Sequence, residues 1–184
     1  MTLRPRRVVA LALMALAVAC GVSAPPSNEL LSNVRLGPEY SQWLIGPIVR
    51  MSSREEVQGY LALTDDAAAA AFIQAYWARR GELLRRSFER RAQEADHRFA
   101  EAGYAGRRTD RGTIYVLHGE PKEVKFDPPE FVDDPPVEVW YYESTEPGLN
   151  GKTPSDVYRF AKYDDLTVFY KRRMHRSDEI DPIH

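Results

Sequence analysis

Cysteine is almost absent from this sequence, whose 184 residues include only Cys20. A chain with one cysteine forms no intramolecular disulfide, so packing has to stabilise the fold. The spacings H-x-x-x-H, H-E-x-x-H, C-x-x-C and G-x-S-x-G are also missing, and no glycine-rich phosphate loop follows a strand. The sequence therefore lacks the usual signals of zinc sites, nucleophilic hydrolases and nucleotide sites. We expect no cofactor and no catalytic residue. There are no internal repeats either.

An excess of charge of one sign is lacking as well. The chain has 25 basic and 27 acidic residues, a net charge of −2. Three arginines lie in an N-terminal segment that we expect to be removed, which leaves 22 basic residues and a net charge of about −5. This balance disfavours a strongly cationic nucleic-acid binder. With 43% hydrophobic and 28% charged residues, the composition fits one globular domain and excludes a disordered polymer.

Long hydrophobic runs are limited to the N-terminus. Twelve apolar residues, Val8 to Ala19, follow the basic start Arg4-Pro5-Arg6-Arg7. A membrane-spanning helix needs about 20 such residues, whereas a secretory signal has this shorter pattern. The small residues before Cys20 resemble a bacterial lipoprotein box, which implies attachment of diacylglycerol to the thiol and cleavage before it. The alternative is an ordinary secretory signal in which Cys20 falls by chance.

These features predict the following organisation. Residues 1–19 are a lipoprotein signal peptide, 20–40 a flexible tether rich in serine and proline, 41–174 an α+β domain, and 175–184 a polar tail. Membrane contact is expected through acyl chains on Cys20. Because Gly21 is not an acidic retention signal, we expect the outer membrane rather than the inner one, with the domain facing the periplasm or the cell surface.

Helical signals fill the first half of the expected domain. Ser52 and Ser53 each precede a glutamate by three residues, the spacing of a capping box, and a short apolar face follows. A second helix is expected over 67–79, with an N-cap in Thr64-Asp65-Asp66, and a third over 82–102. Residues 36–49 are expected to form an irregular arm or a short strand.

Strand signals fill the second half. Val137 to Tyr142 has strand character, and two β-rich runs, 157–163 and 166–171, flank Asp164-Asp165 as a hairpin would. Residues 110–118 carry helix cap and stop signals as well as a β-branched run, and we favour a short helix. Helices followed by strands indicate an α+β fold, with N-terminal helices packed on a small antiparallel sheet.

One stretch has a recognisable motif. Residues 106–121 read G-R-R-T-D-R-G-T-I-Y-V-L-H-G-E-P, which resembles the signature of the GWxTD domain family, roughly G-W-x-T-D-R-G-x-I-Y-I-x-x-G-x-P. The matching residues are Gly106, Thr109, Asp110, Arg111, Gly112, Tyr115, Gly119 and Pro121. Residues 72–80 resemble the family's F-I-x-x-F-W-x-x-R segment, and 138–142, which include Trp140, resemble its E-I-W-x-Y strand. The resemblance implies fold and an exported or lipoprotein location, because the family has no established activity.

The chain departs from this signature at two places. Arg107 stands where the motif has tryptophan, and Gly81 follows Arg80 where Asp-Pro is expected. No role of that tryptophan can therefore be transferred. Read physically, Thr109 can cap the amides that follow it, and Asp110 can pair with Arg108 or Arg111. Gly112 permits close backbone approach or a positive φ. The motif is then a tight turn against the core or, alternatively, a ligand-binding loop.

Two sets of side chains are candidates for function. Asp96, His97, His118 and Glu120, with Asp110, are the acid–base or metal candidates, although Asp96 and His97 diverge on a helix. The second set comes from 79–111, where ten arginines outnumber six acids. The candidates for a binding surface in this segment are Arg85, Arg86, Arg90 and Arg91. Phe131, in a later proline-rich loop, is a further candidate.

Three functional hypotheses follow. The first is a binding or structural accessory module of the bacterial cell envelope, in which the arginines contact anionic lipid or an acidic protein partner. The second is an envelope hydrolase or metal-dependent enzyme, which requires His97, His118, Glu120 and Asp110 to converge. The third is a small-ligand binder that uses the cleft between helices and sheet, with residues 121–136 as its lid.

Overall fold

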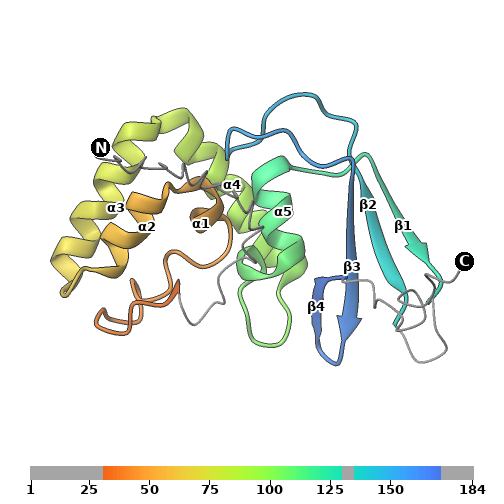
Figure 1. Cartoon of the computed structure of the whole chain (residues 1–184), viewed down its shortest axis with the longest axis horizontal. Coiled ribbons are helices and arrows are strands. Elements are labelled where there is room, and N and C mark those ends of the chain that lie inside the picture. The colour runs from red at the N-terminus through yellow and green to blue at the C-terminus, as the bar shows by residue number, and fades with distance from the viewer. Residues whose placement is uncertain (1–30, 130–134, 171–184) are drawn as a thin grey trace, which may run out of the picture.

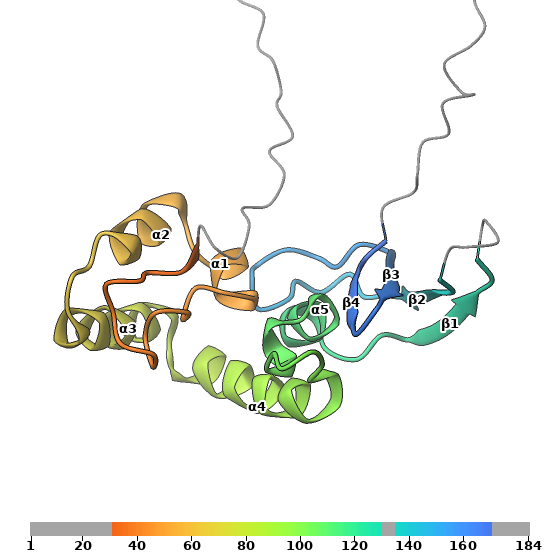
Figure 2. The same ribbon diagram turned by 90° about the horizontal axis from the view of Figure 1, so that it is seen from below.

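The computed structural model describes residues 31–129 and 135–170. The expected signal peptide, Cys20, Phe131 and the tail 175–184 lie outside these ranges. Figures 1 and 2 show helices at one end of the molecule, a sheet at the other, and α5 between them. The elements are α1 (Pro47–Met51), α2 (Arg54–Leu61), α3 (Asp66–Arg80), α4 (Glu82–Phe99), the 3-10 turn η2 (Gly106–Arg108), α5 (Asp110–His118), β1 (Glu123–Asp127), β2 (Val137–Tyr141), β3 (Val157–Tyr163) and β4 (Leu166–Phe169). The α+β prediction is confirmed.

The predicted caps begin two helices. Ser53 accepts a hydrogen bond from the Glu56 amide, and Glu56 accepts one from the Ser53 amide, which completes a capping box at α2. At α3, the Asp65 carboxylate accepts from the Ala68 amide. The other candidate pair fails because Ser52 ends α1 and donates its hydroxyl to the Ile48 carbonyl.

The segment before α1 differs from the flexible tether expected over 20–40. From Leu31 onward the chain packs on the domain, with Leu31 and Leu36 buried. Asn33 fixes it there, because its buried side-chain amide donates to the carbonyls of Tyr60 and Leu63 at the end of α2. Of the two alternatives for 36–49, an irregular arm or a short strand, the irregular arm is observed up to residue 46, where turns lead directly into α1. We call residues 31–46 the arm.

The third helix is shorter than the predicted 82–102. α4 ends at Phe99, and the chain reverses at Ala102 and Gly103, whose φ angles are 50° and 77°. The turn is closed by a backbone hydrogen bond from Tyr104 to Glu101. This reversal brings η2 and α5 back against α4, which places the family motif in the middle of the fold.

The sheet is antiparallel with strand order β1-β2-β3-β4. The predicted hairpin of β3 and β4 is confirmed, and Asp164 at its turn adopts a φ of 52°, which aspartate tolerates better than most residues. β1 was not predicted, because its five residues lie among prolines, and only pairing with β2 makes them a strand. β1 is an exposed edge, where Phe126 is 70% exposed.

Aromatic rings connect the helices with the sheet. Trp140 on β2 packs against Phe99 of α4 and against Phe160 of β3, with ring centroids 5.5 Å and 5.1 Å apart. At the other end, the Trp43 ring of the arm lies 4.8 Å from Tyr60 and 5.0 Å from Tyr76. Offset and edge-to-face rings at these separations are favourable. No helix in the described ranges is both long and apolar enough to cross a membrane.

Ion pairs of Glu56 with Arg79 and Arg80 link α2 to α3 and make the stability depend on pH. Arg80 donates to both carboxylate oxygens of Glu56, at 2.8 Å and 2.6 Å, and to the Met51 carbonyl. The hydrogen bonds from Arg80 to the carboxylate, helped by those from the Ser53 amide and Arg79, outweigh the effect of burial and hold the pKa of Glu56 at about 2, against 4.5 for a free side chain. A carboxyl whose pKa is lowered by folding stabilises the native state at pH values above its unfolded pKa.

We therefore expect Glu56→Gln to lower the free energy of unfolding at pH 7 by about 3 kcal/mol, since one pKa unit corresponds to about 1.4 kcal/mol. The loss should shrink as the pH falls from about 4.5 to about 2, where the wild-type carboxylate becomes protonated. Urea unfolding of the wild-type protein and of the Glu56→Gln variant across this pH range measures the loss of stability. Glu146→Gln, at an exposed position outside the helices and strands, is the control and should have little effect. A pH-independent deficit would contradict the ion-pair explanation.

Candidate functional site

The family motif forms the N-terminus of α5. Thr109 is the N-cap, and its hydroxyl accepts from the Gly112 amide at 3.1 Å and donates to the Gly106 carbonyl at 2.8 Å. The preference for a helix over 110–118 and the capping role of Thr109 are thus confirmed. Asp110 accepts a hydrogen bond at 2.7 Å from the Phe169 amide, at the end of β4. The motif therefore binds the last strand of the sheet to the start of α5.

Two motif glycines allow backbones to touch. A Cβ atom on Gly106 would lie 1.9 Å from the Ala95 carbonyl oxygen, and one on Gly112 would lie 1.8 Å from the Gly106 carbonyl oxygen. Both distances are far below van der Waals contact, and the opposing atoms belong to the backbone. Close approach, rather than a positive φ, is therefore the reason for glycine at these two positions.

Arg111 lies at the centre of a largely buried polar network. Its guanidinium donates to Glu101 and to Glu138, both at 2.9 Å. Trp140 donates its indole N–H to Glu138 at 2.7 Å, and Thr167 donates its hydroxyl to Glu101 at 2.8 Å. The network joins α5 to the turn after α4 and to strands β2 and β4. Two buried atoms of the network, Glu101 Oε1 and Arg111 Nε, have no hydrogen-bond partner among the described residues. The contacts that the network does make join helix to sheet, so its evident role is structural.

The remaining motif residues pack or end elements. Tyr115 lies against Phe99 at 5.5 Å between ring centroids. Gly119 ends α5 with a φ of 82°, and its carbonyl accepts from the Tyr142 hydroxyl at 2.8 Å. Pro121 is buried just before β1. These contacts agree with the reading of the motif as a tight turn against the core.

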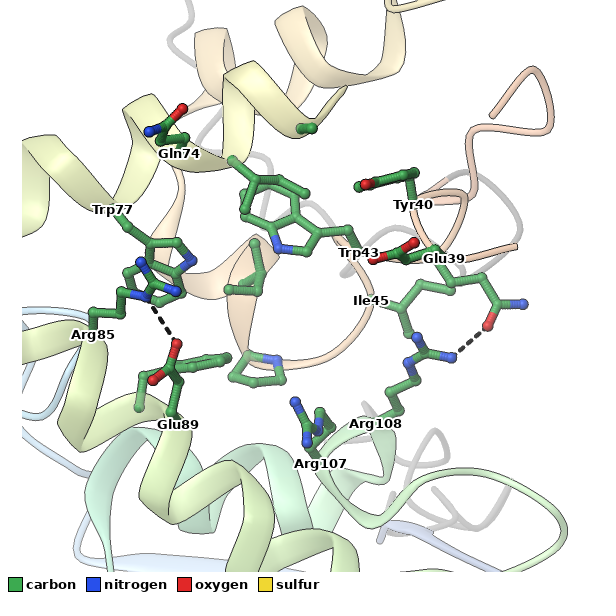
Figure 3. A pocket seen from close by; sticks show the side chains of 16 residues that line it. Glu39, Tyr40, Trp43, Ile45, Gln74, Trp77, Arg85, Glu89, Arg107 and Arg108 are labelled. Carbon is green, nitrogen blue, oxygen red and sulfur yellow. Dashed lines mark hydrogen bonds and ion pairs between the residues drawn. The ribbon is translucent and has the colours of Figure 1, made fainter. Parts of the chain in front are cut away.

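A cavity of about 550 Å³ opens on the other side of the motif. The arm, α1, α3, α4 and η2 surround it, as Figure 3 shows. Its apolar lining includes two tryptophans, Trp43 and Trp77, which face it with Ile73 and Phe88. Its charged lining consists of Glu39, Arg85, Glu89, Arg107 and Arg108. Concave sites with an apolar wall and a few polar groups are the usual form of small-ligand sites.

The cavity arginines differ in how their charge is balanced. Arg85 donates to Glu89 at 2.8 Å. Arg107 donates to Asp96 through its side chain and also through its backbone amide, at 2.8 Å. Burial acts to raise the pKa of Asp96, but the hydrogen bonds from Arg107 outweigh it, and the pKa lies below its usual value. Arg108 instead donates to the neutral side-chain oxygen of Gln42. Burial, reinforced by neighbouring Arg107, lowers the pKa of Arg108.

The acid–base candidates do not come together. Asp110 and His118 occupy opposite ends of α5, and Glu120 is bound by Arg98 at 2.5 Å and 2.9 Å. His97 is exposed on α4. No cluster of three histidine, cysteine or carboxylate side chains suited to a metal ion occurs within 31–129 and 135–170.

His118 has the most unusual surroundings of these candidates. Its ring stacks on Tyr158, with centroids 6.0 Å apart, and its Nδ1 is buried without a hydrogen-bond partner in the described part of the chain. Burial lowers the pKa of His118, and the positive charge of Arg91 adds to the effect. The lowered pKa favours the neutral imidazole. Its position under the loop that carries Gly148 indicates a packing role.

The predicted arginine surface is only partly a free surface. Arg85 and Arg86 are exposed, and each pairs with a glutamate four residues away on α4. Arg90 is exposed. Arg91 turns inward and donates to the carbonyls of Val116 and Leu117, both at 3.2 Å, where it caps the C-terminus of α5.

Sequence analysis missed the part of the cavity that the arm supplies. Tyr40, Gln42 and Trp43 line it, although they lie at the border between the expected tether and domain. The one available signal was the density of aromatic residues in a segment read as irregular. Arg107 and Arg108 were recognised as motif residues, yet their place in a cavity depends on chain segments far away in sequence.

Comparison with known proteins gives one match. The family model described as the GWxTD domain matches residues 37–179, which is more than half of the chain. The match begins inside the arm and includes all described helices and strands after it. No curated protein and no solved structure matches the chain.

Proposed function

The chain belongs to the GWxTD domain family, and we propose that it is a lipid-anchored, extracytoplasmic binding or structural accessory module of the bacterial cell envelope. The observation that carries the binding role is the cavity of about 550 Å³, where an aromatic wall faces two successive arginines. The proposed location rests on the N-terminal sequence, in which the sole cysteine follows a basic and then apolar segment.

Anchoring at Cys20 fixes how far the domain can reach. Ten residues, 21–30, separate the cysteine from the packed arm. Even fully extended, they span at most about 35 Å, since a residue adds about 3.5 Å. The cavity then stays close to the membrane surface, where its ligand or partner has to be found. The outer membrane remains the proposed site, on the basis of Gly21.

The cavity favours binding over catalysis as the proposed role. Arg85, Glu89, Arg107 and Asp96 are held in ion pairs of 2.5 to 2.8 Å, which fix the position of these side chains and engage the carboxylates of Glu89 and Asp96. The small-ligand hypothesis is favoured by the same observation. The cavity lies between the arm and the helices, however, and not in the cleft between helices and sheet. Its walls do not include residues 121–129, part of the expected lid.

The anchor is tested by expressing the full chain in a bacterium, with Cys20→Ala as the matched variant. We expect the wild-type protein to partition into the detergent phase, with a mass that shows loss of residues 1–19 and gain of acyl chains. The variant should stay in the aqueous phase or remain unprocessed. An unmodified Cys20 in the wild-type protein would overturn the proposed location.

Binding is tested on the same material. Crosslinking in intact cells, followed by purification in mild detergent, should recover a reproducible partner or ligand with the wild-type chain. A variant with a filled cavity, Ala70→Phe, should lose it, because Ala70 is an exposed lining residue on α3. If the Ala70→Phe variant recovers the same molecule, that molecule does not bind in the cavity.

A further inference from the structure

Arg108 is the one cavity arginine that forms no direct ion pair with a carboxylate of the described residues, although Asp96, which is bound by Arg107, acts on it through space. Arg85 and Arg107 have carboxylate oxygens at 2.8 Å and 2.5 Å, whereas Arg108 donates to the amide oxygen of Gln42. Placing a guanidinium in a partly dehydrated site without an anion costs free energy. A charge left in this state at the wall of a cavity is a recognition group for an anion.

The wall that faces this charge is apolar and rigid. Trp77 packs on Phe88 with ring centroids 5.0 Å apart, and Trp43 is held by its edge contact with Tyr76. In Figure 3, Trp43 and Trp77 lie across the opening from Arg107 and Arg108. A ligand on these rings would therefore direct a polar end toward η2.

The charges around the opening determine which sign of charge, and how many charges, the polar end of a ligand should carry. Glu89 is neutralised by Arg85, and Asp96 neutralises Arg107, which leaves Arg108 and Glu39. Glu39 is exposed and its charge is screened by water, whereas Arg108 is half-buried, so the positive charge dominates inside the cavity. A cationic head group would meet two arginines on η2. A group with several charges would find only one guanidinium that is not already paired with a carboxylate.

We propose that this cavity binds an apolar ring or short alkyl chain that carries a single carboxylate, with the carboxylate on Arg108 and the apolar part on Trp43 and Trp77. The volume of about 550 Å³ lies in the range of sites for such small molecules. A guanidinium and a carboxylate form two parallel hydrogen bonds, so the ligand would replace the single bond to Gln42. This inference rests on the proposed binding role and names its ligand class.

The test compares 2-naphthoate with 2-naphthamide, which has the same shape and no charge. Both are titrated into the full-length chain in a non-ionic detergent, by calorimetry and by tryptophan emission. Emission is a direct readout because two of the three tryptophans line the cavity. We expect the carboxylate to bind at least tenfold more tightly than the amide.

Variants assign the effect to residues. Arg108→Gln should remove the preference for naphthoate and leave the affinity for naphthamide unchanged. Ala70→Phe should abolish binding of both. Arg86→Gln, an exposed arginine of α4 outside the cavity, is the matched control and should change neither affinity. Thermal unfolding of each variant verifies that it is folded.

Equal affinities for the two compounds, a preference that survives Arg108→Gln, or no binding of either compound would overturn the ligand class. These failures are separable from failure of the proposed function. If Cys20 is acylated and a partner is recovered while naphthoate does not bind, the proposed ligand class is wrong and the proposed function is retained.

Discussion

Replacement of Gly112 by alanine is expected to prevent stable folding, with a loss of more than about 4 kcal/mol in the free energy of unfolding. The new Cβ would lie 1.8 Å from the carbonyl oxygen of Gly106, and the same oxygen accepts the Thr109 hydroxyl that caps α5. Relief would require α5 to move away from η2. Because the obstacle is backbone, no change of rotamer can provide it. Gly106→Ala meets the Ala95 carbonyl oxygen at 1.9 Å and should fail for the same reason.

The matched control is the same substitution at Gly59, inside α2. A Cβ there would lie 3.5 Å from the Phe72 ring, an ordinary contact, and the position is helical. Alanine restricts the unfolded chain and favours helix, so Gly59→Ala should raise stability by about 0.5–1 kcal/mol. Circular dichroism and urea unfolding measure all three variants. A folded Gly112→Ala protein of near wild-type stability would show that the close backbone approach is incorrect.

Replacement of Arg111 by glutamine is expected to cost about 3–5 kcal/mol of stability, the usual effect of removing one member of a buried ion pair. Arg111 is the shared donor to Glu101 and Glu138, whose side chains are 11% and 16% exposed. Its loss leaves two carboxylates near each other at the junction of α4, α5 and the sheet. The junction should loosen before the arm and α3 do, because the latter have their own aromatic contacts.

Urea unfolding gives the size of this effect, and hydrogen exchange gives its location. Arg86→Gln is the control, since Arg86 and its partner Glu82 are 71% and 60% exposed and such pairs contribute about 0.3–0.5 kcal/mol. We expect faster amide exchange in α5 and β4 of the Arg111 variant and unchanged exchange in α3. If Arg111→Gln lowered stability as little as Arg86→Gln does, the network would not be what holds the helices to the sheet.

Several elements could be predicted because their signals are local. Ser53, Asp65 and Thr109 cap amides no more than three residues away, so each cap depends on a short stretch of sequence. The hairpin at Asp164-Asp165 likewise needs only two β-rich runs and a turn. Gly112 was expected to allow either a close backbone approach or a positive φ, and the structure shows the close approach, to a carbonyl that the sequence did not identify.

Other elements could not be predicted because their partners are remote. Arg107 and Arg108 are neighbours in sequence, yet one binds Asp96 on α4 and the other binds Gln42, 66 residues earlier in the arm. β1 exists through its ladder with β2. The arm is packed because Asn33 finds the carbonyls that end α2. None of these outcomes follows from composition or periodicity.

The amino-acid sequence by itself determined the family, the α+β order, three helix caps and one hairpin turn, since hydrogen bonds between near neighbours depend on residue types a few positions apart. The tertiary structure alone decided which arginines are neutralised, where the cavity lies and how Arg111 joins helices to sheet. Those depend on the distance between segments that only the folded chain brings into contact, because packing energies fall off within a few ångströms and the attraction between two charges weakens as their separation grows.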